Sequence, residues 1–82
     1  MANAITLYIP SDALRLPDNA QWGNRFEIHS SSSDRCYTIA QNKDKRHWGC
    51  SCPGWKRWRR CHHLKELGIP GNEIPFEAKL HA

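Results

Sequence analysis

The segment CSCPGWKRWRRCHH, from Cys50 to His63, places three cysteines and two histidines close together in a chain of only 82 residues. A chain of this length buries a modest share of its unfolded surface, so its core is small. Such domains often depend on a disulfide, a bound metal or a partner subunit. Whether these cysteine and histidine side chains form disulfides or bind a metal therefore limits which folds the chain can adopt.

These side chains form two close pairs, Cys50 and Cys52 as C-x-C, and Cys61 and His63 as C-x-H. Thiolate and imidazole donors in this arrangement suit a tetrahedral zinc ion, with each pair supplying one edge of the tetrahedron. A disulfide network explains the pattern less well, because Cys50 and Cys52 are too close to bridge comfortably and the histidines would have no role. We therefore predict one Zn²⁺ bound by Cys50, Cys52, Cys61 and His63.

Other side chains compete for these positions. We expect Cys61 at the cap of a helix and His63 in its first turn, where the helix N-terminus would help to keep the Cys61 thiolate charged. His62 is the alternative ligand, or else faces solvent or hydrogen-bonds a ligand. His47, just before the first pair, can also compete. Cys36 lies well upstream and is expected to be a buried thiol that acts as a small hydrophobic residue.

Alternating apolar residues predict several short strands followed by one helix. Phe26 and Ile28 share one face of a predicted strand, and Tyr37 and Ile39 share one face of the next. Gly68 is expected to cap the helix before Pro70. The predicted strands cover 5–9, 25–30, 35–41 and 46–50, and the predicted helix covers 61–68.

The remaining segments predict irregular chain. Residues 10–24 are rich in turn formers, and residues 31–34 form a serine-rich loop. Pro53 and Gly54 break the chain after Cys52, and the tail after Gly68 is expected to be irregular and anchored by Ile74 and Phe76. The prediction is a small zinc-stabilised α+β domain, an antiparallel meander of two to four short strands followed by a short helix. It forms one domain over 1–82, with a finger core at about 25–68 on which the N-terminal strand and the C-terminal tail pack.

The chain contains no apolar run of the roughly 18 residues needed to cross a bilayer, and its N-terminus lacks the basic lead-in of a secretory signal. We therefore expect an intracellular protein, cytoplasmic or associated with the nucleoid or nucleus. Reducing compartments favour metal binding over disulfides for clustered cysteines.

Positive charge is concentrated around the cysteine cluster. Between Lys43 and Lys65, eight basic residues face the single carboxylate of Asp44, a formal charge of +7 in a chain whose total is +4. Arginine and lysine neutralise phosphates, and exposed tryptophans can stack on bases. We predict a nucleic-acid surface that consists of Lys43, Lys45, Arg46, Lys56, Arg57, Trp58, Arg59 and Arg60.

The other tryptophans have competing roles. A small zinc domain needs large side chains to cover its metal, so Trp48 and Trp55 are expected in the core. Trp22, in an irregular segment, either caps the sheet or belongs to a partner surface.

The segment YTIAQNKDKRHWGCSCPGWKRWRRCHHLKEL resembles the SWIM zinc finger, whose pattern is C-x-C, a variable spacer and C-x-H. Strands before the motif, an aromatic residue in the spacer and apolar residues after the histidine resemble the family as well. The resemblance covers Arg25 to Gly68 and implies zinc binding at Cys50, Cys52, Cys61 and His63. Because SWIM fingers occur in transposases, helicase-like ATPases, ubiquitin-ligase-like proteins and recombination factors, it implies DNA or protein binding only loosely.

We therefore expect a zinc-binding module that binds DNA or RNA through its basic, tryptophan-containing loop. The alternative is a protein-interaction module or a small subunit of a larger nucleic-acid-processing assembly. Catalysis is not expected, because a catalytic zinc keeps an open position whereas three cysteines and one histidine fill the coordination sphere. We also expect no small-molecule substrate and no membrane partner.

Overall fold

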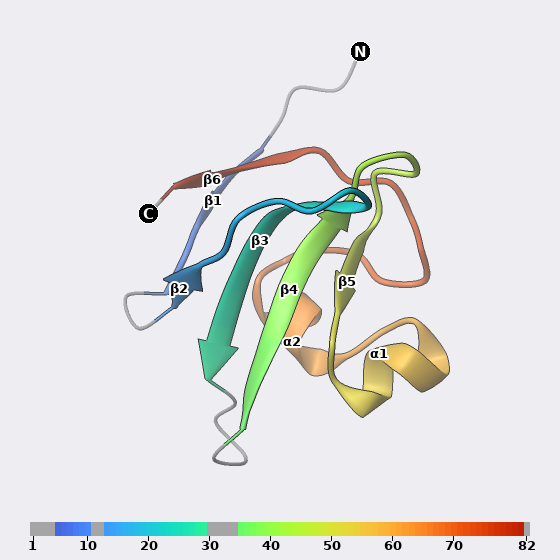
Figure 1. Ribbon diagram of the computed structural model, residues 1–82. Coiled ribbons are helices and arrows are strands. Elements are labelled where there is room, and N and C mark those ends of the chain that lie inside the picture. Colours follow the sequence, from blue (N-terminus) through green and yellow to red (C-terminus); the bar gives the residue numbers. More distant parts are fainter. Residues whose placement is uncertain (1–4, 11–12, 30–34, 82) are drawn as a thin grey trace.

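The computed structural model describes residues 5–10, 13–29 and 35–81 and shows a small α+β fold, as predicted (Figure 1). Strands β2 to β5 form an antiparallel four-stranded sheet in chain order, and β1 and β6 form a separate parallel pair. The predicted loop at 31–34 and the end of the second predicted strand, Ser30, lie outside the described residues. The elements are β1 (Ile5–Tyr8), β2 (Leu14–Arg15), β3 (Trp22–His29), β4 (Cys36–Asn42), β5 (Trp48–Cys50), α1 (Pro53–Trp58), α2 (His62–Glu66) and β6 (Ala78–His81).

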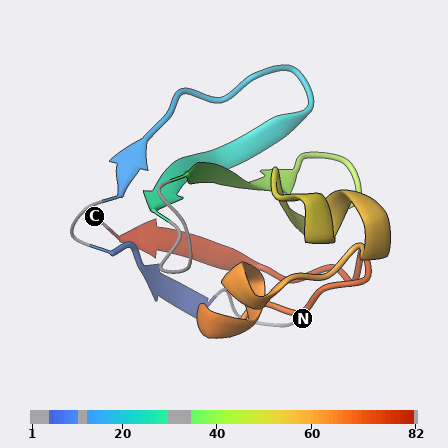
Figure 2. The same cartoon turned by 90° about the horizontal axis from the view of Figure 1, so that it is seen from below.

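One face of the four-stranded sheet, the core face, carries the apolar residues that the alternation predicts. Phe26 pairs with Ile39 and Ile28 pairs with Tyr37 across β3 and β4. Phe26, Ile28 and Ile39 are buried, and Trp48 on β5 is fully buried beside them. Figure 2 shows the β1–β6 pair and α2 on one side of this sheet. The predicted two-residue periodicity of these strands is therefore confirmed.

The segment 10–24 is more ordered than predicted. Leu14 and Arg15 pair with β3 as the edge strand β2, and β3 begins at Trp22 rather than at Arg25. Between Gly23 and Phe26 the register shifts by one residue, and Asn24 adopts a left-handed φ of 49°. This bulge interrupts the alternation of β3, which is why the sequence pattern placed the start of the strand too late.

The prediction of an irregular tail is wrong at its end. Residues 78–81 form β6 and pair in parallel with β1, far away in sequence. Ala78 is buried and Phe76 packs against the core, whereas Ile74, predicted as an anchor, is half exposed. Local composition could not indicate this pairing, because a parallel partner is chosen by long-range contacts.

The spacer between the two ligand pairs is also more regular than predicted. Pro53 does not break the chain but occupies the first turn of α1, where its missing N–H costs no hydrogen bond and its fixed φ suits a helix. The helix ends at Trp58, and its C-cap residue Arg59 adopts a left-handed φ of 58°. None of the helices within the described residues is long and apolar enough to span a bilayer.

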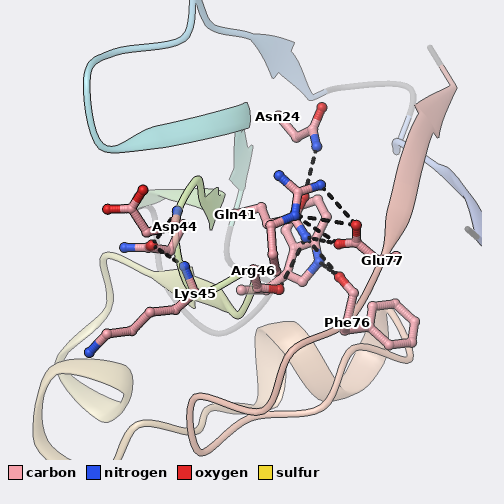
Figure 3. A network of polar contacts seen from close by, with 9 residues as sticks. Asn24, Gln41, Asp44, Lys45, Arg46, Phe76 and Glu77 are labelled. Carbon is pink, nitrogen blue, oxygen red and sulfur yellow. Dashed lines mark hydrogen bonds and ion pairs between the residues drawn. The ribbon is translucent and has the colours of Figure 1, made fainter. Parts of the chain in front are cut away.

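A network of hydrogen bonds around Gln41 ties the sheet to the tail (Figure 3). The buried Gln41 amide donates to the carbonyls of Arg46 and Phe76 and to the Glu77 carboxylate, and its oxygen accepts from Asn24. Glu77 also pairs with the Arg46 guanidinium at 2.9 Å. The hydrogen bond from Arg46 is the main cause that lowers the pKa of Glu77.

We predict that Gln41→Leu lowers the free energy of unfolding by about 1–3 kcal/mol, because it keeps the side-chain shape but leaves buried polar groups without partners. Urea unfolding of the variant and the parent measures this difference. Gln21→Leu is the matched control, because Gln21 is exposed. Equal stability of the two variants would show that the network contributes nothing.

Candidate metal centre

The first ligand pair lies where β5 passes into α1. Cys50 is the last residue of β5, and Cys52 is the N-cap of α1 with an extended backbone (φ −72°, ψ 157°). Side chains two residues apart in extended chain point to the same side, so both buried sulfurs face one site while Ser51 between them is exposed. The Cys52 sulfur also accepts the backbone N–H of Trp55 at 3.4 Å, which fixes the start of α1.

The second pair lies at the start of α2, as predicted. Cys61 is the N-cap with an extended backbone (φ −155°, ψ 163°), and His63 is buried in the first turn. This change from extended to helical backbone brings two side chains together that a regular helix would separate. The Tyr37 ring packs against the His63 ring with centroids 4.9 Å apart and helps to hold the imidazole in place.

The structure brings the four predicted ligand residues together. One ligand atom from each of Cys50, Cys52, Cys61 and His63 lies within 4.8 Å of the others. Nδ1 of His63 is 3.7 Å from the Cys50 sulfur, and its Nε2 is buried without a hydrogen-bond partner among the described residues. Three sulfurs and a buried imidazole at such distances form a site that can hold a metal ion.

The electrostatics of the thiols favour a bound cation. The hydrogen bond between the Cys50 and Cys61 side chains lowers the pKa of Cys61 and raises the pKa of Cys50, whose burial acts in the same direction. The Cys61 thiol therefore loses its proton more readily than the Cys50 thiol, because two thiolates in contact repel each other. A metal cation removes this conflict, since it stabilises every thiolate at once.

The competing residues lie outside this cluster. His62 is exposed, although its ring lies beside the His63 ring. His47 is buried between Trp22 and Trp55, with its centroid 5.7 Å and 5.9 Å from theirs, and its burial lowers its pKa. Cys36 is exposed at the start of β4, so the prediction that it is a buried thiol is wrong. It pairs with His29 at the ends of two strands, beyond the packed part of the sheet.

The tryptophans divide as predicted. Trp48 is fully buried and donates its indole N–H to the carbonyl of Phe76, and Trp55 is buried beside the cluster. Trp22 is half-buried and covers the sheet. Trp58 is 61% exposed on α1, and the Arg57 guanidinium lies 5.5 Å from its ring centroid.

The residues of the predicted basic surface are all exposed, but some of their charges are engaged in ion pairs. Two of its cations form ion pairs, Arg46 with Glu77 at 2.9 Å and Arg59 with Glu73 at 3.4 Å. The turn before β5 approaches the end of α1, because Lys45 and Arg59 line the same hollow. Every member is exposed, and the set consists of Lys43, Lys45, Arg46, Lys56, Arg57, Trp58, Arg59 and Arg60.

Sequence reasoning missed one basic residue that lies beside this surface. Arg25 lines a hollow together with Trp22, Trp55 and Lys56, although it lies far from the +7 segment in sequence. The sequence contains no signal for this placement, since the bulge in β3 determines which way Arg25 points.

We predict that His63→Ala lowers the affinity for a divalent metal by more than about 100-fold, since loss of a ligand should exceed the cost of losing a residue that only supports one. His62→Ala is the matched control and should bind metal like the parent. Cys50→Ser should behave like His63→Ala, and Cys36→Ser like the control. Metal content measured by native mass spectrometry tests all four variants, and loss of metal from the His62 variant alone would contradict the assignment.

Comparison of the chain with protein-family models, with curated proteins and with solved structures finds no match. The resemblance to the SWIM finger therefore rests on the sequence alone, on the C-x-C and C-x-H pairs and the residues around them. What the structure adds is that these four residues lie together and can hold a metal ion.

Proposed function

We propose that this chain is a zinc-binding module of SWIM type that binds nucleic acid through the basic surface around its metal centre. The observation that supports it is the convergence of Cys50, Cys52, Cys61 and His63 from three different elements. Three thiolates and one imidazole are a common donor set of structural zinc sites, and they leave no position open for a substrate.

The distances of the cluster suit zinc. Zinc bonds of about 2.3 Å to sulfur and about 2.0–2.1 Å to nitrogen give a sulfur–nitrogen edge of about 3.5 Å in a tetrahedron. The separation between the Cys50 sulfur and Nδ1 of His63 is 3.7 Å. Thiolate ligands also favour zinc over calcium and magnesium, which prefer oxygen.

A bound zinc ion would cross-link three elements of this fold. Helices α1 and α2 have only 6 and 5 residues, far below the length at which an isolated helix is stable in water. Cys52 and Cys61 are the N-caps of these two helices, and Cys50 ends β5. A bound zinc ion would therefore tie both helices to the edge of the sheet.

Removal of zinc should unfold the two helices, because metal-binding free energy, on the order of 10 kcal/mol in zinc-finger peptides, is also folding free energy. A strong chelator should reduce the helical circular dichroism signal and expose the buried Trp55. Cys50→Ser should reproduce this change without chelator, whereas Cys36→Ser should not. An unchanged spectrum and melting temperature after verified zinc removal would show that the sheet and helices hold together alone.

The charge of the exposed surface supports the choice of partner. Lys43, Lys45, Lys56, Arg57 and Arg60 are exposed and form no ion pair within the described residues. Exposed pairs such as that of Arg59 are weak, but the Glu77 carboxylate that pairs with Arg46 also accepts a hydrogen bond from the Gln41 amide. Five cations without an ion pair among the described residues are thus available for phosphates, and Arg59 can join them because its pair is weak. The exposed ring of Trp58 lies on the same helix as Lys56 and Arg57.

If these five cations contact phosphates of a duplex, the logarithm of the association constant should fall with the logarithm of salt concentration with a slope of about −4 to −5. Replacing Arg57, Arg59 and Arg60 with alanine should weaken binding to all sequences and flatten this slope. Titration of DNA and RNA at several salt concentrations measures both effects. No binding to any nucleic acid at low salt would favour the alternative, a module that binds an acidic protein surface through the same residues.

A further inference from the structure

The face of the sheet opposite the core, the outer face, carries a hollow of about 380 Å³. Its floor contains Ala40 and Gly49, which pair directly across β4 and β5. A Cβ atom on Gly49 would lie 3.0 Å from Nε1 of Trp55 and 3.1 Å from Cη2 of Trp22, so glycine allows both rings to lie against the strand. We call this hollow the outer-face groove and define it by Trp22, Arg25, Ala40, Gly49, Trp55 and Lys56.

The bulge in β3 builds one wall of the groove. Gly23 pairs with Gln41 but Phe26 pairs with Ile39, so β3 holds one extra residue between these two pairs. Trp22 and Arg25, three positions apart, consequently both line the outer-face groove. In a regular strand they would point to opposite faces.

Helix α1 builds the other wall. Trp55, Lys56 and Arg59 line the groove, whereas Arg57 and Trp58 of the same helix do not. The start of this helix depends on the metal centre, because the Cys52 sulfur accepts the N–H of Trp55. The groove therefore shares one wall with the metal site.

The chemistry of the groove is cationic and aromatic. Arg25, Lys56 and Arg59 lie along it, and among the residues that the structure describes, none that lines it is acidic. The hollow beneath the turn before β5 differs, since Asp44 and Glu73 line it. Trp22 is half-buried and presents part of its ring. The volume lies within the range of about 300–1,000 Å³ that is usual for small-ligand pockets.

We propose that the outer-face groove receives an unstacked base and the flanking phosphates of single-stranded DNA or RNA. This inference rests on the proposed function and deepens it, since it names the strand type and the surface. The base would pack against Trp22, and Arg25 and Lys56 would bind the phosphates on either side. A duplex keeps its bases stacked and paired, so placing one of them in a hollow of this kind costs the free energy of unstacking and unpairing that base.

Variants that each remove one positive charge test the proposal, two of them inside the groove and one outside it. The zinc-loaded protein is titrated into a fluorescein-labelled single strand of DNA at several salt concentrations, and anisotropy gives the affinity. Arg25→Gln and Lys56→Gln should each weaken binding about three- to tenfold and reduce the salt slope by about 0.7, the value for one phosphate on a single strand. Arg57→Gln removes the same charge from the neighbouring position, which belongs to the basic surface but does not line the groove. Its effect therefore measures the contribution of a surface cation, and we expect it to be smaller than the effect of Lys56→Gln.

Indole N–H signals in a proton–nitrogen correlation spectrum provide a second measurement. Adding the single strand should shift the signals of Trp22 and Trp55 more than that of Trp58, with assignments from single Trp→Phe variants. Metal content and melting temperature show whether each variant is folded. If Arg25→Gln loses its hydrogen bond to the carbonyl of Pro17 and does not fold, Lys56→Gln and the indole shifts still test the groove.

The outcomes separate this inference from the proposed function. Binding that Arg57→Gln weakens as much as Lys56→Gln does, with a shift at Trp58 instead of Trp22, would place the nucleic acid on the other side of α1. That result would overturn the groove and leave nucleic-acid binding intact. Absence of binding to single strands and duplexes at low salt would overturn both.

Discussion

The pairing of β4 with the three residues of β5 is the interaction on which the other parts of this structure depend. Because side chains alternate along a strand, Trp48 and Cys50 point to the core face and Gly49 points to the outer face. Trp48 fills the core, Cys50 starts the ligand cluster, and Gly49 lets two tryptophan rings lie against the sheet. A slip of one residue in this register would exchange these roles and remove all three features at once.

The polar network around Gln41 holds the second half of the chain to this strand pair. Gln41 and the indole of Trp48 both bind the carbonyl of Phe76, which positions the chain that leads into β6. The same network engages Arg46 through Glu77. A residue that the charge pattern assigns to nucleic-acid binding therefore has a structural partner.

The candidate metal centre and the outer-face groove lie on two sides of one small helix, α1. Cys52 caps α1 on the side of the cluster, and Lys56 and Trp55 line the groove. In the proposed zinc-bound protein, the metal would therefore position a wall of the nucleic-acid surface without touching the nucleic acid. Under the proposed function, a coordination sphere filled by four protein ligands would affect binding through the position of α1.

Features that depend on short spacings could be predicted from the amino-acid sequence. Ligands two residues apart in extended or capping backbone must face one site, and alternation places Phe26 and Ile39 in the core. Other features could be seen only in the tertiary structure. They are the parallel pairing of β1 with β6, the helix in the spacer, the exposure of Cys36 and the bulge in β3 that directs Arg25 into the groove. The physical reason is that local periodicity reports which face a side chain shares with its neighbours. Contacts between residues far apart in sequence determine which strands pair, where a bulge forms and which side chains are covered by the rest of the protein.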